Sequence, residues 1–352
     1  MTISLGILSD LLNADGSFAF PGYSLRLLRH RERIAVSRVP GGTTLDREIS
    51  NQVDFLISVP TATAIDGSNL APGCRLAAIL RVGVGCDDID LSACTEAGVA
   101  VVIPTVAVTR PTAVAALTLM LALATRLIEK DRVTRQGDAE WHRRSDLQGC
   151  NLHGRVLGLV GCGAIGSQFA SYALVLGMAV VAFDPALSPQ DAERLGIRLA
   201  GIDEVLAGSD FISLHCPLNA STRHMINDKR LALVKPTACL INTSRGGLVD
   251  QVALYKVLSN RRLRGAALDV FEPEPLPRGE PLLALDNVIF SAHALNWTRE
   301  LDEEIADENV QAINALLEGA CPHKIANPAV LESGAYRRKL ANLQSRLGSS
   351  GT

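Results

Sequence analysis

The sequence predicts an α/β fold that contains two parallel sheets, and three observations support this class. Short apolar runs alternate with segments of helical character from Ile3 to about Ile103, which is the pattern of a parallel α/β layer. Six further strand-like runs follow between Arg155 and Ala292. The first of these six runs leads directly into a glycine-rich turn and a helical segment, an order that open parallel sheets use at their binding edge.

Length and composition are those of a compact globular protein. The chain has 352 residues, enough for about two domains of ordinary size, and 47% of them are hydrophobic. The 34 basic residues nearly balance the 37 acidic ones, so the chain has no overall cationic field of the kind that holds a polyanion. We therefore expect no nucleic-acid partner.

Three features bear on the compartment. The eight cysteines never form a C-x-x-C pair, and the N-terminus lacks the basic start and apolar run of a signal peptide. The longest apolar stretch, Ala113 to Ala124, is too short to cross a bilayer and is interpreted as a buried helix. These features predict a reduced, cytoplasmic protein without a membrane partner.

The first part of the chain contains four strand-like runs and two helical segments before a long helix. The runs are Ile3–Leu8, Phe55–Val59, Ala77–Val82 and Val99–Ile103, and the helical segments are Tyr23–Arg33 and Asp90–Ala97. A long helix, opened by Pro111 and running to about Gln136, has an apolar first half and a charged second half. Because its apolar stripe exceeds what one domain face needs, we expect this helix to form the interface of a homodimer.

The second part of the chain contains six strand-like runs, the number that a complete dinucleotide-binding sheet uses. They are Val156–Val160, Ala179–Phe183, Phe211–Leu214, Cys239–Asn242, Ala266–Val270 and Val288–Ser291. An amphipathic helix follows from Thr298 to about Glu318 and stops at Gly319. The tail from about Gly334 is polar, and we expect it to be frayed.

A lone helix after a complete sheet usually packs back on an earlier domain, which predicts a discontinuous domain organisation. Residues 1–104 and 297–333 would form a smaller, flavodoxin-like substrate domain. Residues 105–296 would form the inserted six-stranded dinucleotide-binding domain, and residues 334–352 a tail. The two crossings, near Pro104 and Trp297, could hinge.

The glycine turn has the order and spacing of a nucleotide-binding fingerprint. The strand Val156–Val160 runs into Gly161-Cys162-Gly163-Ala164-Ile165-Gly166, and a helical pattern follows from Ser167 to Leu176. Gly161 would allow the tight turn, Gly163 the approach of a pyrophosphate, and Gly166 the close packing of helix on strand. The alternative reading is a plain glycine turn.

Asp184 strengthens the nucleotide interpretation. It ends the next strand, 23 residues after Gly161, where a carboxylate accepts hydrogen bonds from the adenosine ribose hydroxyls. It would repel a 2′-phosphate, and the following Pro185-Ala186-Leu187 supplies no arginine to neutralise one. The sequence therefore predicts NAD rather than NADP, although Asp184 taken alone could be a helix-cap or turn aspartate.

Three side chains suited to hydride-transfer chemistry follow strands on the same edge of the predicted sheet. Reduction of a carbonyl needs a proton donor and a cation for the substrate carboxylate. Arg245, Glu274 and His293 each follow a strand, and one carboxylate can orient the imidazole and favour its protonated form. In isolation Arg245 could be an ion-paired helix-start arginine, and His293 a structural histidine.

These motifs together resemble the D-isomer-specific 2-hydroxyacid dehydrogenase family over nearly the whole chain. The resemblance rests on Arg81-Val82-Gly83-Val84-Gly85-Cys86-Asp87-Asp88-Ile89-Asp90, on the glycine turn, on His215-Cys216-Pro217-Leu218-Asn219 and on the Arg245, Glu274 and His293 segments. It implies that Arg245 binds the substrate carboxylate and carbonyl, that His293 is the acid/base, and that Glu274 pairs with His293.

The resemblance also implies the other contacts of the site. Backbone groups of Val82, Gly83 and Val84 would hold the substrate carboxylate, and Asp269 would orient the nicotinamide amide. Further cofactor contacts would come from Ala164, Ile165, His215, Cys216, Pro217, Thr222, Thr243 and Ser244. No metal is expected, because the other histidines have neither H-E-x-x-H spacing nor cysteine partners at ligand intervals.

The chain departs from the family pattern at a few positions. Ala292 stands where proline usually precedes the histidine, and Ala294-Leu295-Asn296-Trp297 replaces a common glycine-rich run, so Trp297 is assigned to the substrate site. Asp88 stands where asparagine is frequent, and Ala116 where the dimer helix often has glutamate.

We expect the chain to interconvert a small, non-phosphorylated D-2-hydroxy acid and its 2-keto acid with NAD, as a glyoxylate or hydroxypyruvate reductase does, in an interdomain cleft. The segment Ser58–Thr63 lacks the arginines by which similar phosphoglycerate dehydrogenases would hold a phosphate. The alternatives are 3-phosphoglycerate oxidation and an NAD(H)-sensing, corepressor-like binding protein on the same fold.

Overall fold

The structure is a computed structural model that describes residues 2–42, 44–60, 63–71 and 73–348. The chain divides into two compact units. The first unit contains residues 1–108 and 297–352, and the second unit contains residues 109–296. Each unit is built on one parallel sheet.

The sheet of the first unit has five parallel strands in the order β2-β1-β3-β4-β5, which is the flavodoxin-like order and confirms that part of the predicted fold class. The strands are β1 (Ile3–Leu8), β2 (Ile34–Val39), β3 (Phe55–Ser58), β4 (Ala78–Arg81) and β5 (Ala100–Val102). The sequence did not predict β2, because only its two end residues are buried and its exposed middle includes Ser37 and Arg38.

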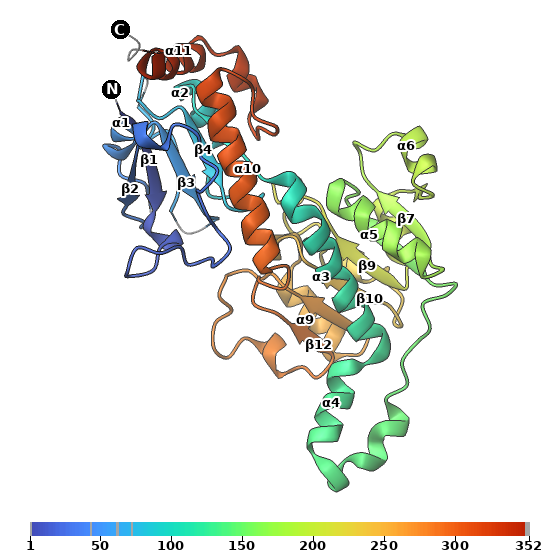
Figure 1. Cartoon of the computed structure of the whole chain (residues 1–352). Helices are drawn as coiled ribbons and strands as arrows, with labels where there is room; N and C mark the ends of the chain where they lie inside the picture. Colours follow the sequence, from blue (N-terminus) through green and yellow to red (C-terminus); the bar gives the residue numbers. More distant parts are fainter. Residues whose placement is uncertain (1, 43, 61–62, 72, 349–352) are drawn as a thin grey trace. The chain divides into compact units, whose positions relative to one another are not determined.

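Helices cover both faces of this sheet (Figure 1). They are α1 (Ile49–Gln52), α2 (Leu91–Ala97), α10 (Arg299–Glu318) and α11 (Gly334–Gly348), with 3-10 turns η1 (Ser9–Leu11), η2 (Arg31–Arg33) and η7 (Pro328–Glu332). Helix α10 lies where it was predicted: the Thr298 side chain accepts from the Leu301 N–H at its start, and left-handed Gly319 ends it.

The helix predicted over Tyr23–Arg33 is wrong. Apart from η2 this segment consists of turns and extended chain. The Ser24 hydroxyl accepts hydrogen bonds from the Arg26 backbone N–H and side-chain Nε, and Asn314 Oδ1 accepts from the Arg29 N–H. Such bonds compete with a helical backbone ladder, although the buried Leu25 and Leu28 give the segment a helical spacing.

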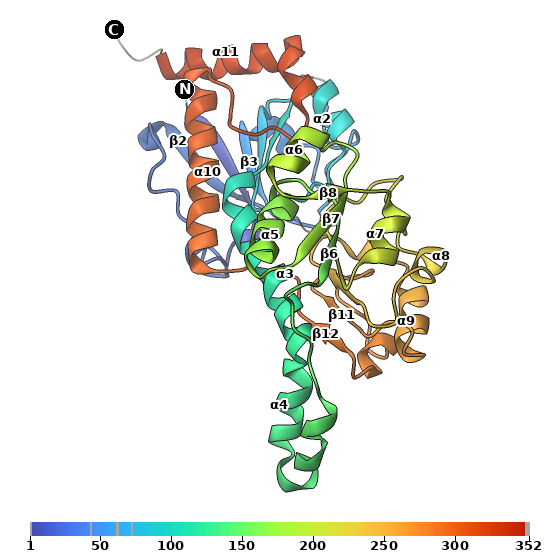
Figure 2. The same ribbon diagram turned by 90° about the vertical axis from the view of Figure 1, so that its right-hand side faces the viewer.

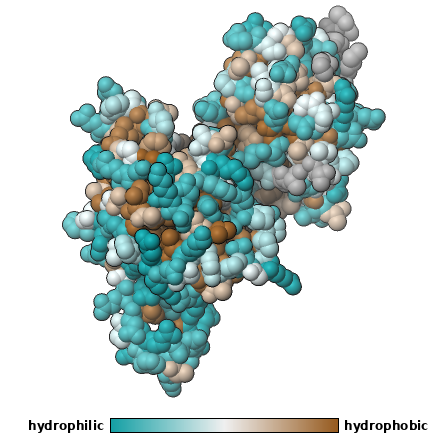
Figure 3. Space-filling view, turned by 180° about the vertical axis from the view of Figure 1, so that it is seen from behind, coloured by the Kyte–Doolittle hydropathy of each residue, from teal (hydrophilic) through white to brown (hydrophobic). Residues whose placement is uncertain are grey.

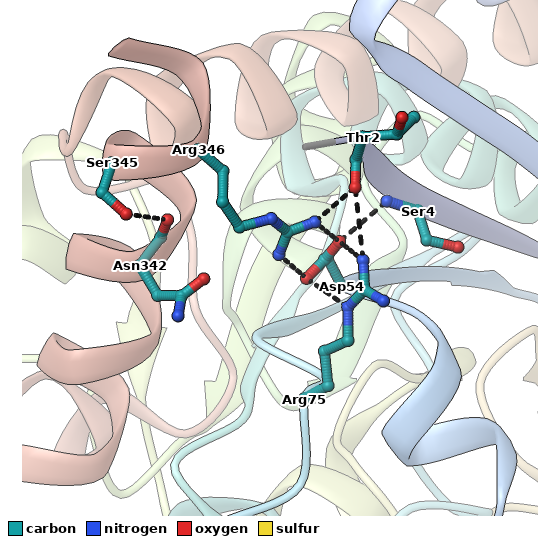
Figure 4. Close-up of polar contacts among 7 residues, drawn as sticks. All are labelled: Thr2, Ser4, Asp54, Arg75, Asn342, Ser345 and Arg346. Carbon is teal, nitrogen blue, oxygen red and sulfur yellow. Dashed lines mark hydrogen bonds and ion pairs between the residues drawn. The ribbon is translucent and has the colours of Figure 1, made fainter. Parts of the chain in front are cut away.

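The frayed tail predicted from Gly334 is also wrong, because residues 334–348 form helix α11; residues 349–352 lie outside the described residues. Figure 4 shows the anchor: Asp54, 2% exposed, pairs with Arg346 of α11 at 2.6 Å and with Arg75 at 2.6 Å. Burial raises the pKa of Asp54, but hydrogen bonds from Arg346, Arg75 and the Ser4 N–H outweigh it and hold that pKa below its usual value. Buried Tyr336 and Leu343, with Leu340 and Leu347 packed against the same core, also hold this helix.

The sheet of the second unit has seven parallel strands in the order β12-β11-β10-β9-β6-β7-β8. They are β6 (Val156–Val160), β7 (Ala179–Phe183), β8 (Arg198–Leu199), β9 (Phe211–Leu214), β10 (Cys239–Asn242), β11 (Gly265–Leu268) and β12 (Val288–Phe290). All six predicted strands are present. The predicted count of six is wrong, because the two-residue β8 is too short and too exposed to form an apolar run.

The strand order reverses between β6 and β9, and such a switch point in a doubly wound sheet is where a ligand crevice forms. Helices cover both faces of the sheet (Figure 2). The helices of this unit are α3 (Thr105–Thr125), α4 (Leu127–Arg135), α5 (Ala164–Val175), α6 (Pro189–Arg194), α7 (Ile202–Gly208), α8 (Asp228–Leu231) and α9 (Gln251–Ser259), with η3 (Gly137–Ala139), η4 (Trp141–Asp146), η5 (Gly246–Leu248) and η6 (Pro281–Ala284). Of these, α4 extends away from the sheet (Figure 2).

The long helix differs from its predicted bounds. It begins at Thr105, with Pro111 inside it, because the Glu308 carboxylate accepts the otherwise unpaired Ala107 N–H at 2.6 Å. It ends at Thr125, where left-handed Arg126 separates α3 from α4. By length and composition α3 could also cross a membrane, and half of its apolar window is buried inside the protein.

Candidate active site

The predicted site residues of the second unit lie at the carboxyl ends of its strands. Gly161 follows β6, Asp184 follows β7 and His215 follows β9. Arg245 follows β10, Asp269 and Glu274 follow β11, and His293 follows β12. Since the strands are parallel, one edge of the sheet carries all these side chains.

The glycine turn is tightly packed on one side and open on the other. A Cβ on Gly161, whose φ is +93°, would lie 2.6 Å from the carbonyl carbon of His215, and one on Gly166 would lie 2.6 Å from the Gly161 oxygen. A Cβ on Gly163, the residue that caps α5, would meet no atom within 4 Å. The open side faces away from the packing contacts, at the N-terminus of a helix, where phosphates bind.

Asp184 is half-buried beside this turn. Its Oδ2 accepts from the Cys162 N–H at 2.7 Å, and its Oδ1 accepts from the Ala186 N–H at 2.8 Å. The second bond, to a backbone N–H two residues later, is the one that a turn aspartate makes. Asp184 therefore also stabilises the turn that follows β7. The first bond fixes the carboxylate against the glycine turn.

The loop after β9 is held by its own hydrogen bonds. His215 Nε2 lies 2.9 Å from Ser213 Oγ, and burial lowers the pKa of His215 to about 4, which keeps the ring neutral. The Ser244 hydroxyl donates to the Cys216 carbonyl at 2.6 Å, and the Thr222 hydroxyl donates to the Pro217 carbonyl at 2.7 Å. The loop therefore joins the β10 end of the site.

Two further side chains of this loop region bear on cofactor binding. Burial raises the pKa of the Cys216 thiol to about 11, so the thiol is protonated at neutral pH. The Thr243 hydroxyl oxygen is buried and has no hydrogen-bond partner among the residues that the structure describes, which suits a ligand contact.

His293 and Glu274 form the pair that was predicted. His293 Nδ1 lies 2.8 Å from Glu274 Oε2, and Glu274 Oε1 accepts from the Phe271 N–H at 2.8 Å. Burial raises the pKa of Glu274, but hydrogen bonds from His293 and Phe271 outweigh it and, with the charges of His293 and Arg245, lower that pKa. The carboxylate is therefore ionised at neutral pH, while Nε2 of the ring is left for another partner.

The backbone around this pair is closely constrained. His293 has φ of 51°, a left-handed conformation that a non-glycine residue keeps only when its surroundings enforce it. Buried Asp269 accepts from the Ser291 hydroxyl at 2.5 Å and from the Ala294 N–H at 3.3 Å. These bonds tie the end of β11 to the loop that carries His293.

Arg245 is presented by a turn that packs against the Glu274 loop. Its backbone carbonyl accepts from Asn242 Nδ2 at 2.8 Å, and its Nη1 donates to the Ser244 carbonyl at 2.6 Å. A Cβ on the next residue, Gly246, would lie 1.9 Å from the Phe271 carbonyl carbon, so only glycine permits this approach.

The remaining predicted residues belong to the first unit. Val82, Gly83 and Val84 form a loop after β4 in which Gly83 has φ of +127°. Trp297 is 58% exposed and lies edge-on to Phe20, with ring centroids 5.4 Å apart. The second unit thus brings together the glycine turn, Asp184, the β9 loop and Arg245, Asp269, Glu274 and His293 as one site.

Sequence reasoning missed several residues that support the site: Ser291, Gln251, Arg223, His224 and Glu272. The first two act through hydrogen bonds, Ser291 with Asp269 and Gln251 with the Glu272 backbone. Glu272 contacts Arg223 and His224, and the available signal was its place in the motif Phe271-Glu272-Pro273-Glu274. Among the described residues, no group of three His, Cys, Asp or Glu side chains could hold a metal ion.

A glycine turn at the switch point, a carboxylate held against that turn and an ionised carboxylate–imidazole pair are typical of an NAD-dependent oxidoreductase. Residues 117–294 match the family model described as D-isomer specific 2-hydroxyacid dehydrogenase, NAD binding domain. The chain therefore belongs to the D-isomer specific 2-hydroxyacid dehydrogenase family, and its cofactor is NAD, as the sequence predicts.

Similar proteins have related activities. The chain is 37% identical to a glyoxylate reductase from Korarchaeum cryptofilum over 281 residues, 79% of this chain and 84% of the relative. It is 36% identical to a D-3-phosphoglycerate dehydrogenase from Methanocaldococcus jannaschii over 84% of this chain, but it spans only 56% of that relative. A glyoxylate reductase structure from Paecilomyes thermophila matches with a TM-score of 0.79 and 27% identity, over 93% of this chain and 99% of that one.

Proposed function

We propose that this protein interconverts a small, non-phosphorylated D-2-hydroxy acid and its 2-keto acid, as glyoxylate or hydroxypyruvate reductases do. The observation that carries the proposal is the 2.8 Å contact between His293 and Glu274, at the sheet edge that also carries Arg245 and the glycine turn. A carboxylate-held imidazole is a proton donor and acceptor, and an arginine binds a carboxylate through two parallel hydrogen bonds.

In this proposal each residue has a separate role. Arg245 holds the carboxylate and carbonyl oxygens of the keto acid, and protonated His293 gives its proton to the oxygen as negative charge develops there. Glu274 keeps the imidazole ring in place and stabilises its charged form. The nicotinamide, when bound, supplies the hydride for reduction and accepts it in oxidation.

The residues present fit NAD. The open face at Gly163 leaves room for the pyrophosphate, with Gly161, Ala164, Ile165 and Gly166 completing the turn. Asp184 would accept the ribose hydroxyls, and the unpartnered Thr243 hydroxyl has a hydrogen bond to give. Further contacts are proposed from His215, Cys216, Pro217, Thr222, Ser244 and Asp269.

A non-phosphorylated substrate is favoured by the surroundings of Arg81, the cation beside the Val82–Val84 loop. Its side chain is fully buried and donates to Gly85 and Val59 carbonyls, to Ser58 Oγ and to both oxygens of Asp88, at 2.6 and 3.1 Å. A charge that is already paired and buried is not available to a substrate phosphate.

The nearby segment Ser58–Thr63 contributes no other cation, although Thr61 and Ala62 lie outside the described residues and enter only by sequence. Backbone groups of Val82, Gly83 and Val84 are proposed to hold the substrate carboxylate. Trp297, exposed next to Phe20, is proposed to contact the variable part of the substrate.

We propose a cytoplasmic homodimer that forms through α3 and α4. Large apolar side chains are exposed along these helices: Val114, Leu121, Leu127 and Ile128. Most of the surface seen in Figure 3 is, by contrast, hydrophilic. Among the described residues no two cysteines form a disulfide bond, as expected in a reducing compartment. Light scattering tests the dimer: a monomer at micromolar concentration would contradict it.

A panel of 2-keto acids, assayed by NADH oxidation, tests the proposed function. We expect turnover of glyoxylate, hydroxypyruvate or a similarly small keto acid. Bound NADH without turnover of any panel member would contradict the proposal and support the alternative of an NAD(H)-sensing binding protein.

A further inference from the structure

Glu272, two residues before Glu274, connects two loops of the site. Its Oε1 accepts from Arg223 Nη2 at 2.5 Å, and its Oε2 lies 2.9 Å from His224 Nε2. Arg223 and His224 directly follow Thr222 in the loop after β9. One carboxylate therefore joins the predicted cofactor loop to the loop that carries Glu274.

The backbone of Glu272 is fixed independently of its side chain. Gln251, the first residue of α9, accepts from the Glu272 N–H at 2.9 Å and donates to the Glu272 carbonyl at 2.6 Å. Two opposed hydrogen bonds from one amide hold a single peptide segment in one orientation. The backbone that carries the Glu272 carboxylate is therefore held in place by Gln251.

The turn after Arg245 packs into the same junction. The His224 N–H donates to the Gly247 carbonyl at 2.8 Å, and a Cβ on Gly247 would lie 3.2 Å from Glu272 Oε1. His224 has φ of 48°, a conformation that persists in a non-glycine residue only where several contacts enforce it. Three loops that supply cofactor, substrate and acid/base residues therefore meet at Glu272.

The Glu272 carboxylate is ionised at neutral pH. Burial raises the pKa of Glu272, but hydrogen bonds from His224 and Arg223 outweigh it and hold that pKa below its usual value. The side chains of Arg223, His224 and Glu272 are 54%, 45% and 31% exposed, and ion pairs so exposed contribute little to global stability. A role in stability alone does not account for a carboxylate with two partners and a clamped backbone.

We propose that Glu272 is a positioning residue that couples the cofactor loop to the acid/base pair, so that Thr222 and Pro217 keep a fixed place relative to Glu274 and His293. The proposal rests on the function proposed above. Breaking the connection should loosen cofactor binding and slow turnover together, because a small misplacement of a catalytic group strongly reduces rate.

The test compares Glu272→Gln with the wild-type protein by fluorescence titration with NADH, by steady-state kinetics with an active 2-keto acid, and by thermal unfolding. The matched control is Glu204→Gln, which breaks an exposed 2.6 Å pair with Arg198 in the same unit. For Glu272→Gln we expect the NADH Kd to rise about fivefold and kcat to fall about tenfold. The Tm should stay within about 2 °C in both variants, because the pairs are exposed.

Combining substitutions on the two sides of the contact separates the loss of this connection from other effects of the Glu272 substitution. Adding Glu272→Gln to a protein that already carries Arg223→Gln and His224→Gln should change the NADH Kd by less than about twofold, because the connection is already broken. Unchanged NADH Kd and kcat in Glu272→Gln, or additive losses in the combined variant, would overturn the proposal.

A second variant and the NADH titrations cover the cases in which a variant does not fold or no keto acid is reduced. If Glu272→Gln does not fold, Arg223→Gln alone tests the same connection, since the arginine is exposed and only one contact is lost. If the wild-type protein reduces no 2-keto acid, the proposed function fails, yet the NADH titrations still decide whether Glu272 couples the loops.

Discussion

Replacing Glu274 with glutamine removes the charge from the partner of His293 while nearly keeping the size of the side chain. A hydrogen bond between charged groups contributes about 1.5 to 3 kcal/mol when it is shielded from water. The His293 and Glu274 side chains are 45% and 35% exposed, and solvent screening reduces that contribution to about 1 kcal/mol. The protonated ring is therefore expected to lose about 1 kcal/mol of stabilisation.

Keto-acid reduction consumes the proton on His293, so the rate falls at high pH, where the ring has lost it. Loss of this stabilisation should move the fall in activity to a lower pH in the variant than in the wild-type protein, because the charge that favours the protonated imidazole is gone. The loss should be smaller at acidic pH, where the ring is protonated in both proteins. A pH–rate profile of kcat/KM for keto-acid reduction measures this shift, and an unchanged profile would refute the pairing of these residues.

Three further predictions concern the cofactor, the substrate and stability. NADH should be preferred over NADPH in kcat/KM, and Asp184→Ser should narrow the preference, because a carboxylate held against the glycine turn would repel a 2′-phosphate; equal or better use of NADPH by the wild-type protein would contradict this. Turnover of 3-phosphoglycerate should not exceed that of glycerate by tenfold, a ratio worth about 1.4 kcal/mol, because Arg81 is buried and paired. Asp54→Asn should lower the unfolding free energy of the wild-type protein by about 3 kcal/mol in denaturant titrations at pH 7, because two arginines lose their partner. Because the folded-state pKa of Asp54 is lowered, its contribution is present above the ordinary aspartate pKa and is lost as the pH falls through the lowered value; equal stability of the variant at pH 7 would contradict this.

The sequence predicted most strands because buried parallel strands are continuous apolar runs. The runs at β6, β7, β9 and β10 have the predicted bounds, whereas β8, two residues long, left no such signal. Helix α11 was missed although Tyr336, Leu340, Leu343 and Leu347 recur at helical spacing, because polar and charged residues separate them and its ion pair with Asp54 leaves no signal in the sequence.

Some residues of the candidate site could be predicted from the sequence, and others could not. Arg245, Glu274 and His293 could be predicted because each follows a strand, and the topology brings strand ends to one edge. The role of Glu272 could not be predicted, because its partners lie 48 and 49 residues earlier in the chain. Only the folded loops bring these side chains within hydrogen-bond distance.

The most direct test of the central claim is the turnover of His293→Ala. Because this imidazole is proposed to give its proton to the keto oxygen, kcat for keto-acid reduction should fall by about 10² to 10⁴. The NADH Kd should remain close to the wild-type value, because the glycine turn and Asp184 are unchanged. Near-normal turnover by His293→Ala would contradict the mechanism.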